Sequence, residues 1–404
     1  MRTDTLPRLA VLGAEPAFAD PLHVGAPNLG DRAAFFRRLE QVLDSGRLTN
    51  RGPCVREFEE KLRPLTGAEH VVALCNGTIA LELGARALGL AGEVLVPAYT
   101  FVATAHALRW QGIEPVFCDV DPVTHQIDPA DAARRITPAT TGILAVHLWG
   151  RPAPHAELRA LADRHGLRLM YDAAHALGAT HAGRGIGSLG DLTVLSFHAT
   201  KVLGTAEGGA IATRDPRLAE RVRLMANFGF TGLDQVEALG INGKMSELSA
   251  AMGLASLDHL DGWIAANRRN REAWRVALAP LPGVTLLDEI TSDARNHHYV
   301  VAVVEPECPL SRDHLLAVLR AENALARRYF FPGCHRMEPY RSTPPAGGWR
   351  LPVTETLAER VLVLPNGTRT TPADIALCGE ILQRAVAGGP ALAARIDAGA
   401  GGAS

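Results

Sequence analysis

The sequence predicts an α/β protein with a mostly parallel sheet flanked by helices, followed by a smaller C-terminal α+β domain. From Ala68 to Asp172, short apolar runs alternate with segments of helical periodicity, a pattern typical of such a sheet. The 404 residues are 47% hydrophobic and 21% charged, which is an ordinary globular composition with enough length for one large and one smaller domain. At 280–283 a Pro-Leu-Pro-Gly stretch marks the change from helical to strand-like patterns.

The N-terminal region is predicted to form an arm and two helices. Residues 1–22 lack clear periodicity, so we expect an arm that packs on the body or on a partner. Apolar residues at helical spacing predict a first helix at 31–43, with Asp31 as its N-cap. A second helix is predicted at 55–63, ended by Pro64 and Gly67.

Strands and helices then alternate, and the spacing favours a sheet that is covered on both faces. We expect strands at 70–74, 93–97, 115–120, 142–148 and 167–172, with helices between them at 79–90, 103–112, 128–136 and 155–165.

A buried strand begins at Val194 and a second strand follows at 210–212. Beyond it the patterns predict a helix at 216–227, a loop at 229–243 and a long helix from 246 to 278. The rest of the chain shows strand patterns at 284–287, 299–304 and 329–331 and helical patterns at 312–322, 354–360 and 372–386. We therefore expect a large domain at 23–265, a small domain at 266–387 and a frayed Ala/Gly-rich tail at 388–404.

Charge and cysteine usage exclude several classes of protein. The net charge is −2, so no basic surplus points to nucleic acid or an anionic membrane. The six cysteines include no CxxC pair, which argues against a zinc site or a disulfide framework. No run approaches the roughly 18 apolar residues of a membrane span, and the N-terminus has no signal-peptide core. We expect a cytoplasmic protein.

Lys201 is the principal catalytic candidate. It lies in a polar turn between the strand that begins at Val194 and a glycine-rich loop that leads to the strand at 210–212. A lysine that is partly desolvated at a sheet edge loses basicity and becomes a nucleophile toward aldehydes. A surface loop lysine is the alternative when this residue is considered alone.

Four more features occur where predicted strands end, which is where open α/β sheets bind ligands. Asn76-Gly77-Thr78 precedes a helix and is suited to phosphate, or is a tight turn with an N-cap. Asp172 ends a buried strand and needs a partner, for which a protonated pyridine nitrogen is suited; a structural capping role is the alternative.

The other two features are an aromatic residue and a hydroxyl. Phe101 can stack on a planar cofactor or belong to the core, and Ser196 can reach a phosphate or be a turn residue. His175 follows Asp172 by three residues and can lie over the same ring, or pack. A phosphate site, an aromatic plate, a carboxylate for a ring nitrogen and an amine for an aldehyde together describe pyridoxal 5'-phosphate.

With these motifs the sequence resembles the DegT/DnrJ/StrS sugar aminotransferases, which are fold-type I pyridoxal-phosphate enzymes with an aspartate aminotransferase-like fold. The resemblance covers about residues 25–385. It rests on CNGT at 75–78, the run at 96–104, PVFCDVD at 115–121, DAAH at 172–175, SFHATK at 196–201 and GINGKMSE at 240–247.

The resemblance implies roles at the matching positions. Lys201 would form an aldimine with the cofactor and move the proton, and Asp172 would pair with the pyridine nitrogen. Phe101 would stack on the ring, His175 would lie against the cofactor, and Gly77, Thr78 and Ser196 would contact the phosphate. Asn242 would reach the phosphate of the neighbouring subunit, which implies a homodimer with shared active sites. His335 would lie near the substrate.

Two positions help to separate branches of the family. Gly243 and Lys244 stand where the family often has an aromatic residue and an arginine, so a bidentate contact is in question there. The dehydratase branch replaces the catalytic lysine by histidine, whereas Lys201 is present here, which favours amino transfer.

The resemblance implies an aminotransferase that moves the amino group of glutamate to a nucleotide-activated keto-deoxysugar. The GKMSE and GCHRMEPY versions at 243–247 and 333–340 are most similar to relatives that aminate C4 of dTDP-4-keto-6-deoxyglucose. Amination at C3, an inosose substrate, and a non-catalytic cofactor-binding regulatory protein remain as alternatives.

Overall fold

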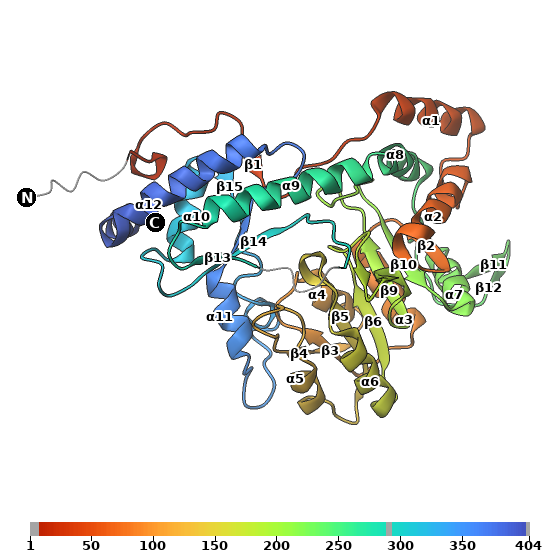
Figure 1. The fold of residues 1–404 in the computed structure, drawn as a ribbon. Coiled ribbons are helices and arrows are strands. Elements are labelled where there is room, and N and C mark those ends of the chain that lie inside the picture. The colour runs from red at the N-terminus through yellow and green to blue at the C-terminus, as the bar shows by residue number, and fades with distance from the viewer. Residues whose placement is uncertain (1–7, 288–292, 401–404) are drawn as a thin grey trace, which may run out of the picture.

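The computed structural model of the protein describes residues 8–287 and 293–400. Its centre is a seven-stranded sheet in which one strand is antiparallel to both neighbours and all other neighbouring strands are parallel, as predicted (Figure 1). In spatial order the strands are β2 (His70–Leu74), the antiparallel β10 (Gly209–Thr213), β9 (Leu192–Ser196), β6 (Arg168–Asp172), β5 (Thr140–Val146), β3 (Glu93–Pro97) and β4 (Glu114–Cys118).

Both faces of this sheet are buried because its strands are apolar on both sides. Successive residues of a strand point to opposite faces, so on β5 Ile143 and Ala145 join one apolar cluster and Leu144 joins the other. Each buried Leu, Ile or Val contributes about 1.5–3 kcal/mol. The first face is covered by α2 (Pro53–Thr66), α5 (Pro129–Arg134), α6 (His155–His165) and α8 (Glu247–Leu257), and the second by α3 (Gly77–Ala87), α4 (Ala103–Arg109) and α7 (Pro216–Ala226).

The C-terminal part is a smaller α+β unit, as predicted. Its antiparallel sheet contains β13 (Val284–Leu286), β14 (Val300–Val304) and β16 (Val361–Leu364). One face packs on α9 (Leu260–Leu278), α10 (Arg312–Ala321) and α12 (Pro372–Ala400), and the other on α11 (Pro352–Arg360). Figure 1 shows α9 running from α8 to a position alongside α12.

The N-terminal segment packs on this C-terminal unit. Leu9 and Phe18 are buried in its apolar cluster, and β1 (Leu22–His23) pairs with β15 (Ala324–Leu325). The Glu322 carboxylate accepts hydrogen bonds from the N–H groups of Ala10 and Ala17, both at 2.8 Å. The part of the predicted arm that the structure describes therefore packs on the body, and residues 1–7 lie outside the described residues. The domain boundaries at 22, 265 and 387 stay predictions.

Two helix predictions differ from the structure in where a helix ends. The long helix expected at 246–278 is divided into α8 and α9 at Asp258 and His259. The apolar spacing continues through the break, so the sequence pattern does not mark it. Pro64 lies inside α2, because a proline in the last turn removes only one hydrogen bond and has a φ suited to a helix. Gly67, the other predicted end, is the C-cap of α2. The first helix, α1 (Arg32–Ser45), begins as predicted at Asp31, whose side chain accepts hydrogen bonds from the N–H groups of Ala33 and Ala34.

Two segments with strand-like or loop-like patterns also differ from the prediction. Residues 329–331 form turns, and the strand of that region is β15. Their aromatic side chains face other rings, as when Phe330 stacks on Trp149 at 5.3 Å. The expected loop at 229–243 contains a hairpin of β11 (Phe230–Gly232) and β12 (Gln235–Val236), and a hairpin of β7 (Thr180–His181) and β8 (Arg184–Gly185) was missed.

The prediction of a frayed tail was wrong for the residues that the structure describes. Helix α12 continues to Ala400 through a kink at Gly389, where φ is 49°. It continues because Leu392 is fully buried and Ile396 packs on the same cluster as α9 and α10. Residues 401–404 of the predicted tail lie outside the described residues. Among the described helices, none has the length and apolar character needed to cross a membrane.

Candidate active site

The predicted site residues converge at the carboxyl ends of the parallel strands. A cavity of ≈ 570 Å³ lies there, and its lining comes from both the large sheet and the C-terminal unit. Seven of the nine predicted residues line it, namely Gly77, Thr78, Phe101, Asp172, His175, Ser196 and Lys201. These residues meet because the ends of β6 and β9 and the first turn of α3 lie at the same edge of the sheet. That edge is where parallel α/β sheets bind ligands.

Asp172 is the last residue of β6, and it is buried. Its Oδ2 accepts a hydrogen bond from the Thr104 hydroxyl at 2.9 Å, and its Oδ1 accepts one from Ala174 N–H at 3.0 Å. Burial raises the pKa of this carboxyl, while the two hydrogen bonds and the positive charge of Lys201 lower it. The carboxylate is thus held in place for a cationic partner in the cavity.

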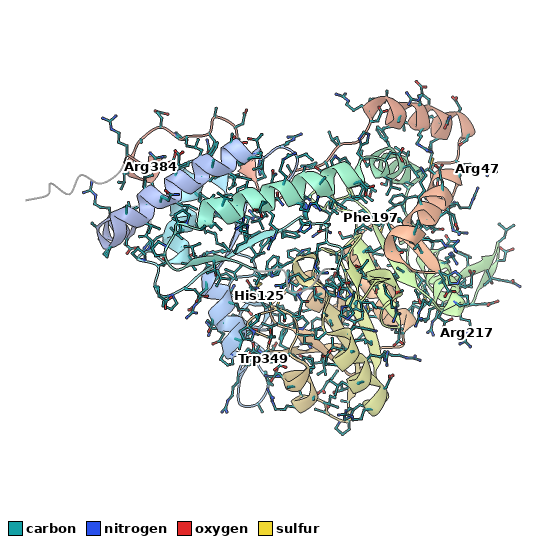
Figure 2. All side chains as sticks on the ribbon, viewed as in Figure 1. Arg47, His125, Phe197, Arg217, Trp349 and Arg384 are labelled. Atoms are coloured by element: carbon teal, nitrogen blue, oxygen red, sulfur yellow. The ribbon has the colours of Figure 1, made fainter. Side chains whose placement is uncertain are left out.

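Lys201 lies in a tight loop that connects β9 to β10. Phe197, labelled in Figure 2, anchors this loop: its N–H donates to Gly208 O at 2.8 Å and its ring packs edge-on against Phe58 at 5.3 Å. The Lys201 amine donates to the Tyr299 hydroxyl at 3.3 Å. Burial lowers the pKa of Lys201, although the nearby Asp172 raises it, so the net direction favours a neutral, nucleophilic amine.

The first turn of α3 has the features of an anion site. Asn76 caps the helix by accepting a hydrogen bond from Ile79 N–H at 2.8 Å, and Gly77 and Thr78 follow it. A Cβ at Gly77 would lie 3.1 Å from the Ser196 Cβ, so a larger residue would require Ser196 to move by a few tenths of an ångström. Free N–H groups and the helix dipole make this turn suited to phosphate.

Phe101 and His175 supply aromatic surface to the cavity. The Phe101 side chain is 58% exposed, which is unusual for a core aromatic and leaves its ring free to cover a ligand. His175 is buried, and burial lowers its pKa well below the usual value. Its ring lies 4.2 Å from that of Tyr299, and its Nδ1 accepts from Trp149 N–H at 3.4 Å. The imidazole therefore stays neutral.

Two predicted residues lie outside this cavity. Asn242 is exposed and forms a β-bridge with Asn227, so the predicted contact with a neighbouring subunit stays a prediction. His335 is buried, and its Nε2 lies 3.3 Å from Glu355 Oε1 on α11. The chain turns at Gly333, and Cys334 N–H bonds to Ala98 O, which directs His335 away from the cavity. His335 does not line this cavity, and its expected position near the substrate stays a prediction.

Several residues of the site were missed by the sequence analysis. Thr104 lies within the quoted run at 96–104 but had no role assigned to it. His198 and Thr200 line the cavity and lie within the quoted motif at 196–201, again with no role assigned. Other lining residues lie outside the quoted motifs, in the loop after Lys201 or in the C-terminal unit: Glu207, Tyr299, Arg327, Tyr329 and Phe330.

The arrangement fits pyridoxal phosphate on its own chemistry. A Cβ at Gly77 would crowd Ser196, so this turn presents backbone, as a phosphate site needs, and Asp172 offers a buried carboxylate to a cationic ring nitrogen. Lys201 offers a poorly solvated amine to an aldehyde in the same cavity. The residues present therefore match the phosphate, ring and aldehyde of this cofactor.

Comparisons with known proteins agree with this arrangement. The profile of the DegT/DnrJ/EryC1/StrS aminotransferase family, whose members are pyridoxal-phosphate enzymes, matches residues 30–383. The dTDP-4-amino-4,6-dideoxy-D-glucose transaminase of Shigella dysenteriae is 38% identical over 312 residues, which is 77% of this chain and 85% of that protein. The dTDP-3-amino-3,4,6-trideoxy-alpha-D-glucose transaminase of Streptomyces venezuelae is 35% identical over 339 residues, which is 83% of this chain and 88% of that protein.

A solved structure is similar along nearly the whole length. The crystal structure of DesI in the presence of its TDP-sugar product matches with a TM-score of 0.92 and 49% identity, over 96% of this chain and 98% of that one. The chain therefore belongs to the DegT/DnrJ/EryC1/StrS aminotransferase family and is a sugar aminotransferase.

Proposed function

We propose that the protein uses pyridoxal phosphate to transfer the amino group of glutamate to C4 of dTDP-4-keto-6-deoxyglucose. The products are 2-oxoglutarate and the 4-amino sugar, so the amine and the keto oxygen change places between the two substrates. The observation that supports the chemistry best is the presence of Lys201, Asp172 and the first turn of α3 in one cavity. The proposal includes the predicted cytoplasmic location.

Three parts of the cavity would hold the cofactor. The N–H groups of the first turn of α3, with Thr78 and Ser196, would bind its phosphate, and the Asp172 carboxylate would keep its ring nitrogen protonated. Phe101 would cover one face of the ring. When bound, pyridoxal phosphate supplies an electron sink for the carbon that carries the amino group.

Lys201 would bind the aldehyde and move the proton. Its lowered pKa leaves Nζ able to accept a proton from the amino donor and to return it in the second half-reaction. The rings of Trp149, Tyr299 and Phe330 pack together on one side of the site and exclude water from it.

The choice of substrates rests on the similar proteins and on one arginine. DesI was crystallised with a TDP-sugar product, and the transaminase of Shigella dysenteriae is named for a 4-amino sugar. Among the described residues that line the cavity, Arg327 is the side chain with a permanent cationic group. A guanidinium at this position suits the carboxylates of glutamate or the diphosphate of a nucleotide sugar.

We also propose a homodimer with shared active sites. The hairpin of β11 and β12 and its flanks carry exposed apolar side chains next to Asn242, and α1 exposes Phe36 and Leu43. A second copy of the chain would cover such surfaces. The exposed apolar residues of the hairpin region are Phe228, Phe230, Leu233, Val236, Leu239 and Ile241.

A panel of dTDP-keto sugars with glutamate tests the proposal. We expect the purified protein, loaded with pyridoxal phosphate, to form 2-oxoglutarate and to place the amine at C4, as read by NMR of the product. The similar transaminase of Streptomyces venezuelae is named for a 3-amino sugar, so an amine at C3 would contradict the proposed position.

Absorption spectroscopy with Lys201→Ala provides the control. Glutamate should bleach the band of the bound cofactor in the wild-type protein, whereas a band that glutamate leaves unchanged would favour the non-catalytic alternative. Lys201→Ala should lose covalent attachment of the cofactor and slow turnover at least about a thousandfold.

A further inference from the structure

The segment of residues 298–299, which precedes β14 of the C-terminal unit, contacts the loop that presents the catalytic lysine. The backbone oxygen of Thr200 accepts a hydrogen bond from His298 Nε2 at 2.8 Å. Burial lowers the pKa of His298 to about 4, so its ring is neutral and Nε2 carries the proton. The neighbouring residue, Tyr299, reaches the side chain of Lys201.

The Tyr299 phenol is held by the rings around it. Its ring centroid lies 4.2 Å from that of His175, 4.8 Å from that of His298 and 5.7 Å from that of Trp149. The Tyr299 hydroxyl is 3.3 Å from Lys201 Nζ and accepts a hydrogen bond from it. The oxygen is therefore a fixed point toward which the flexible lysine side chain is directed.

The free amine of Lys201 needs such a fixed point in every turnover. In the proposed reaction, glutamate takes the place of Lys201 on the cofactor, so the lysine is a free amine during the proton transfers and between the half-reactions. We propose that the Tyr299 hydroxyl holds the Lys201 amine in the cavity whenever that amine is not bonded to the cofactor, which makes Tyr299 a positioning residue for both half-reactions. This inference rests on the proposed function.

The hydrogen bond leaves the amine ready to react. Because the amine donates to the phenol, the nitrogen lone pair remains available for a proton or an aldehyde. Burial raises the pKa of Tyr299, so the phenol itself stays protonated. An acceptor stabilises an ammonium more than a neutral amine, so removal of the oxygen should lower the pKa of Lys201. The other titratable groups that affect Lys201 or Tyr299 are Asp172, His175, His298 and Tyr329.

Capture of pyridoxal phosphate by the cofactor-free protein tests this role without measuring turnover. The stopped-flow rate of covalent capture is followed against pH for the wild type and for Tyr299→Phe. Only the neutral amine attacks the aldehyde, so we expect the midpoint of the profile in Tyr299→Phe to lie about half to one pH unit below that of the wild type. Titration of the cofactor itself is common to both proteins and cancels in the comparison.

Tyr340→Phe is the matched control. Tyr340 is also buried, and its hydroxyl makes a 2.8 Å hydrogen bond to His106 Nδ1 outside the cavity. Its removal should leave the midpoint unchanged. If Tyr299→Phe folds poorly, Tyr299→Leu provides the same measurement with a different packing residue.

The outcomes separate the two proposals. A midpoint in Tyr299→Phe equal to or above that of the wild type would overturn the role of Tyr299, because loss of the accepting oxygen should lower the pKa of Lys201. A wild-type protein that captures no pyridoxal phosphate would instead overturn the proposed function. In single-turnover experiments at neutral pH, Tyr299→Phe should also slow the half-reaction with glutamate by about three- to tenfold, since a free amine is held less well.

Discussion

At the scale of single residues, Asp172 owes its charge state to two opposed effects. Burial raises the pKa of the carboxyl, and hydrogen bonds from Thr104 and Ala174 lower it. Burial outweighs the two donors, so the pKa of the carboxyl lies above its usual value, and the donors reduce that rise. They thereby favour the carboxylate, which is the form that pairs with a protonated ring nitrogen. Thr104 thereby acts on the cofactor site through Asp172 and without lining the cavity itself.

Thr104→Val should shift the acid side of the pH–activity profile. The substitution removes the hydroxyl donor to Asp172, so the pKa of the carboxyl rises and the carboxylate is lost at a higher pH. We expect the acid limb of kcat/KM to move up by about half to one pH unit. Thr100→Val is the matched control, because the Thr100 hydroxyl bonds to Thr104 Oγ1 at 3.1 Å and not to Asp172. An acid limb that both variants move equally would count against the assigned role of Thr104.

At the scale of helices and strands, the close approach of α3 to β9 and β10 builds the anion site. Gly77 lies against Ser196 at the end of β9, and a Cβ at Gly209 of β10 would lie 2.5 Å from the backbone of Asn76. The backbone of the first turn can therefore reach a phosphate because these elements meet through glycine.

Gly77→Ala should weaken binding of pyridoxal phosphate by about tenfold or more, because the new Cβ displaces Ser196 at a cost of about 1–3 kcal/mol. Equilibrium titration of the cofactor-free protein gives the Kd. The contrasting control is Gly262→Ala in α9, where a Cβ would meet nothing within 4 Å. That variant should raise stability by about 0.5–1 kcal/mol and leave the Kd unchanged. An unchanged Kd in Gly77→Ala would mean that the turn is not part of the cofactor site.

At the scale of the whole molecule, three buried histidines link folding to pH. Burial lowers the pKa of His147 to about 3 and the pKa of His125 and His298 to about 4, whereas an unfolded chain has a histidine pKa of roughly 6.5. Above pH ~6.5 the histidines are neutral in both states, and their contribution to stability is fully present. As the pH falls from there toward 4, the unfolded chain takes up protons that the folded protein cannot, so stability is lost.

Urea unfolding of the cofactor-free protein between pH 6.5 and 4.5 measures this loss. Each buried histidine should contribute about 1.4 kcal/mol per pH unit to the fall in unfolding free energy over this range. His147→Asn keeps an acceptor for Ala153 N–H, which bonds to His147 Nδ1 at 2.9 Å, and should reduce the slope by one histidine's share. A slope equal to that of the wild type would show that His147 is not protonated on unfolding.

A second prediction for the whole molecule concerns the proposed dimer. If Lys201 of one subunit and Asn242 of the other form each site, a heterodimer of Lys201→Ala and Asn242→Asp subunits contains one intact site and one doubly altered site. We expect each variant alone to be nearly inactive and the doubly tagged heterodimer, purified after co-expression, to recover about half of the wild-type activity. A heterodimer that stays inactive would show that each subunit uses its own Asn242.

Local patterns predicted most of the large domain because they reflect local physics. Apolar runs of strand length that are bounded by turn residues favour buried strands, and helical spacing with caps such as Asp31 is read from neighbouring residues. Lys201 and Asp172 could be placed together for a related reason: carboxyl ends of parallel strands meet at one edge of the sheet. The division between α8 and α9 was not predicted, since neither proline nor glycine stands at Asp258 and His259 to mark a helix end.

The sequence by itself determined the alternation of strands and helices, the amine, the carboxylate and the phosphate turn, because each of these is written in residues close together in the chain. Only the tertiary structure decided that Tyr299 and Arg327 reach the cavity, that His335 turns toward Glu355, and that Leu392 keeps α12 helical beyond its kink. These positions depend on how the C-terminal unit packs on the large sheet. That packing is a sum of contacts between residues about a hundred or more positions apart, as the 98 positions between Lys201 and Tyr299 illustrate.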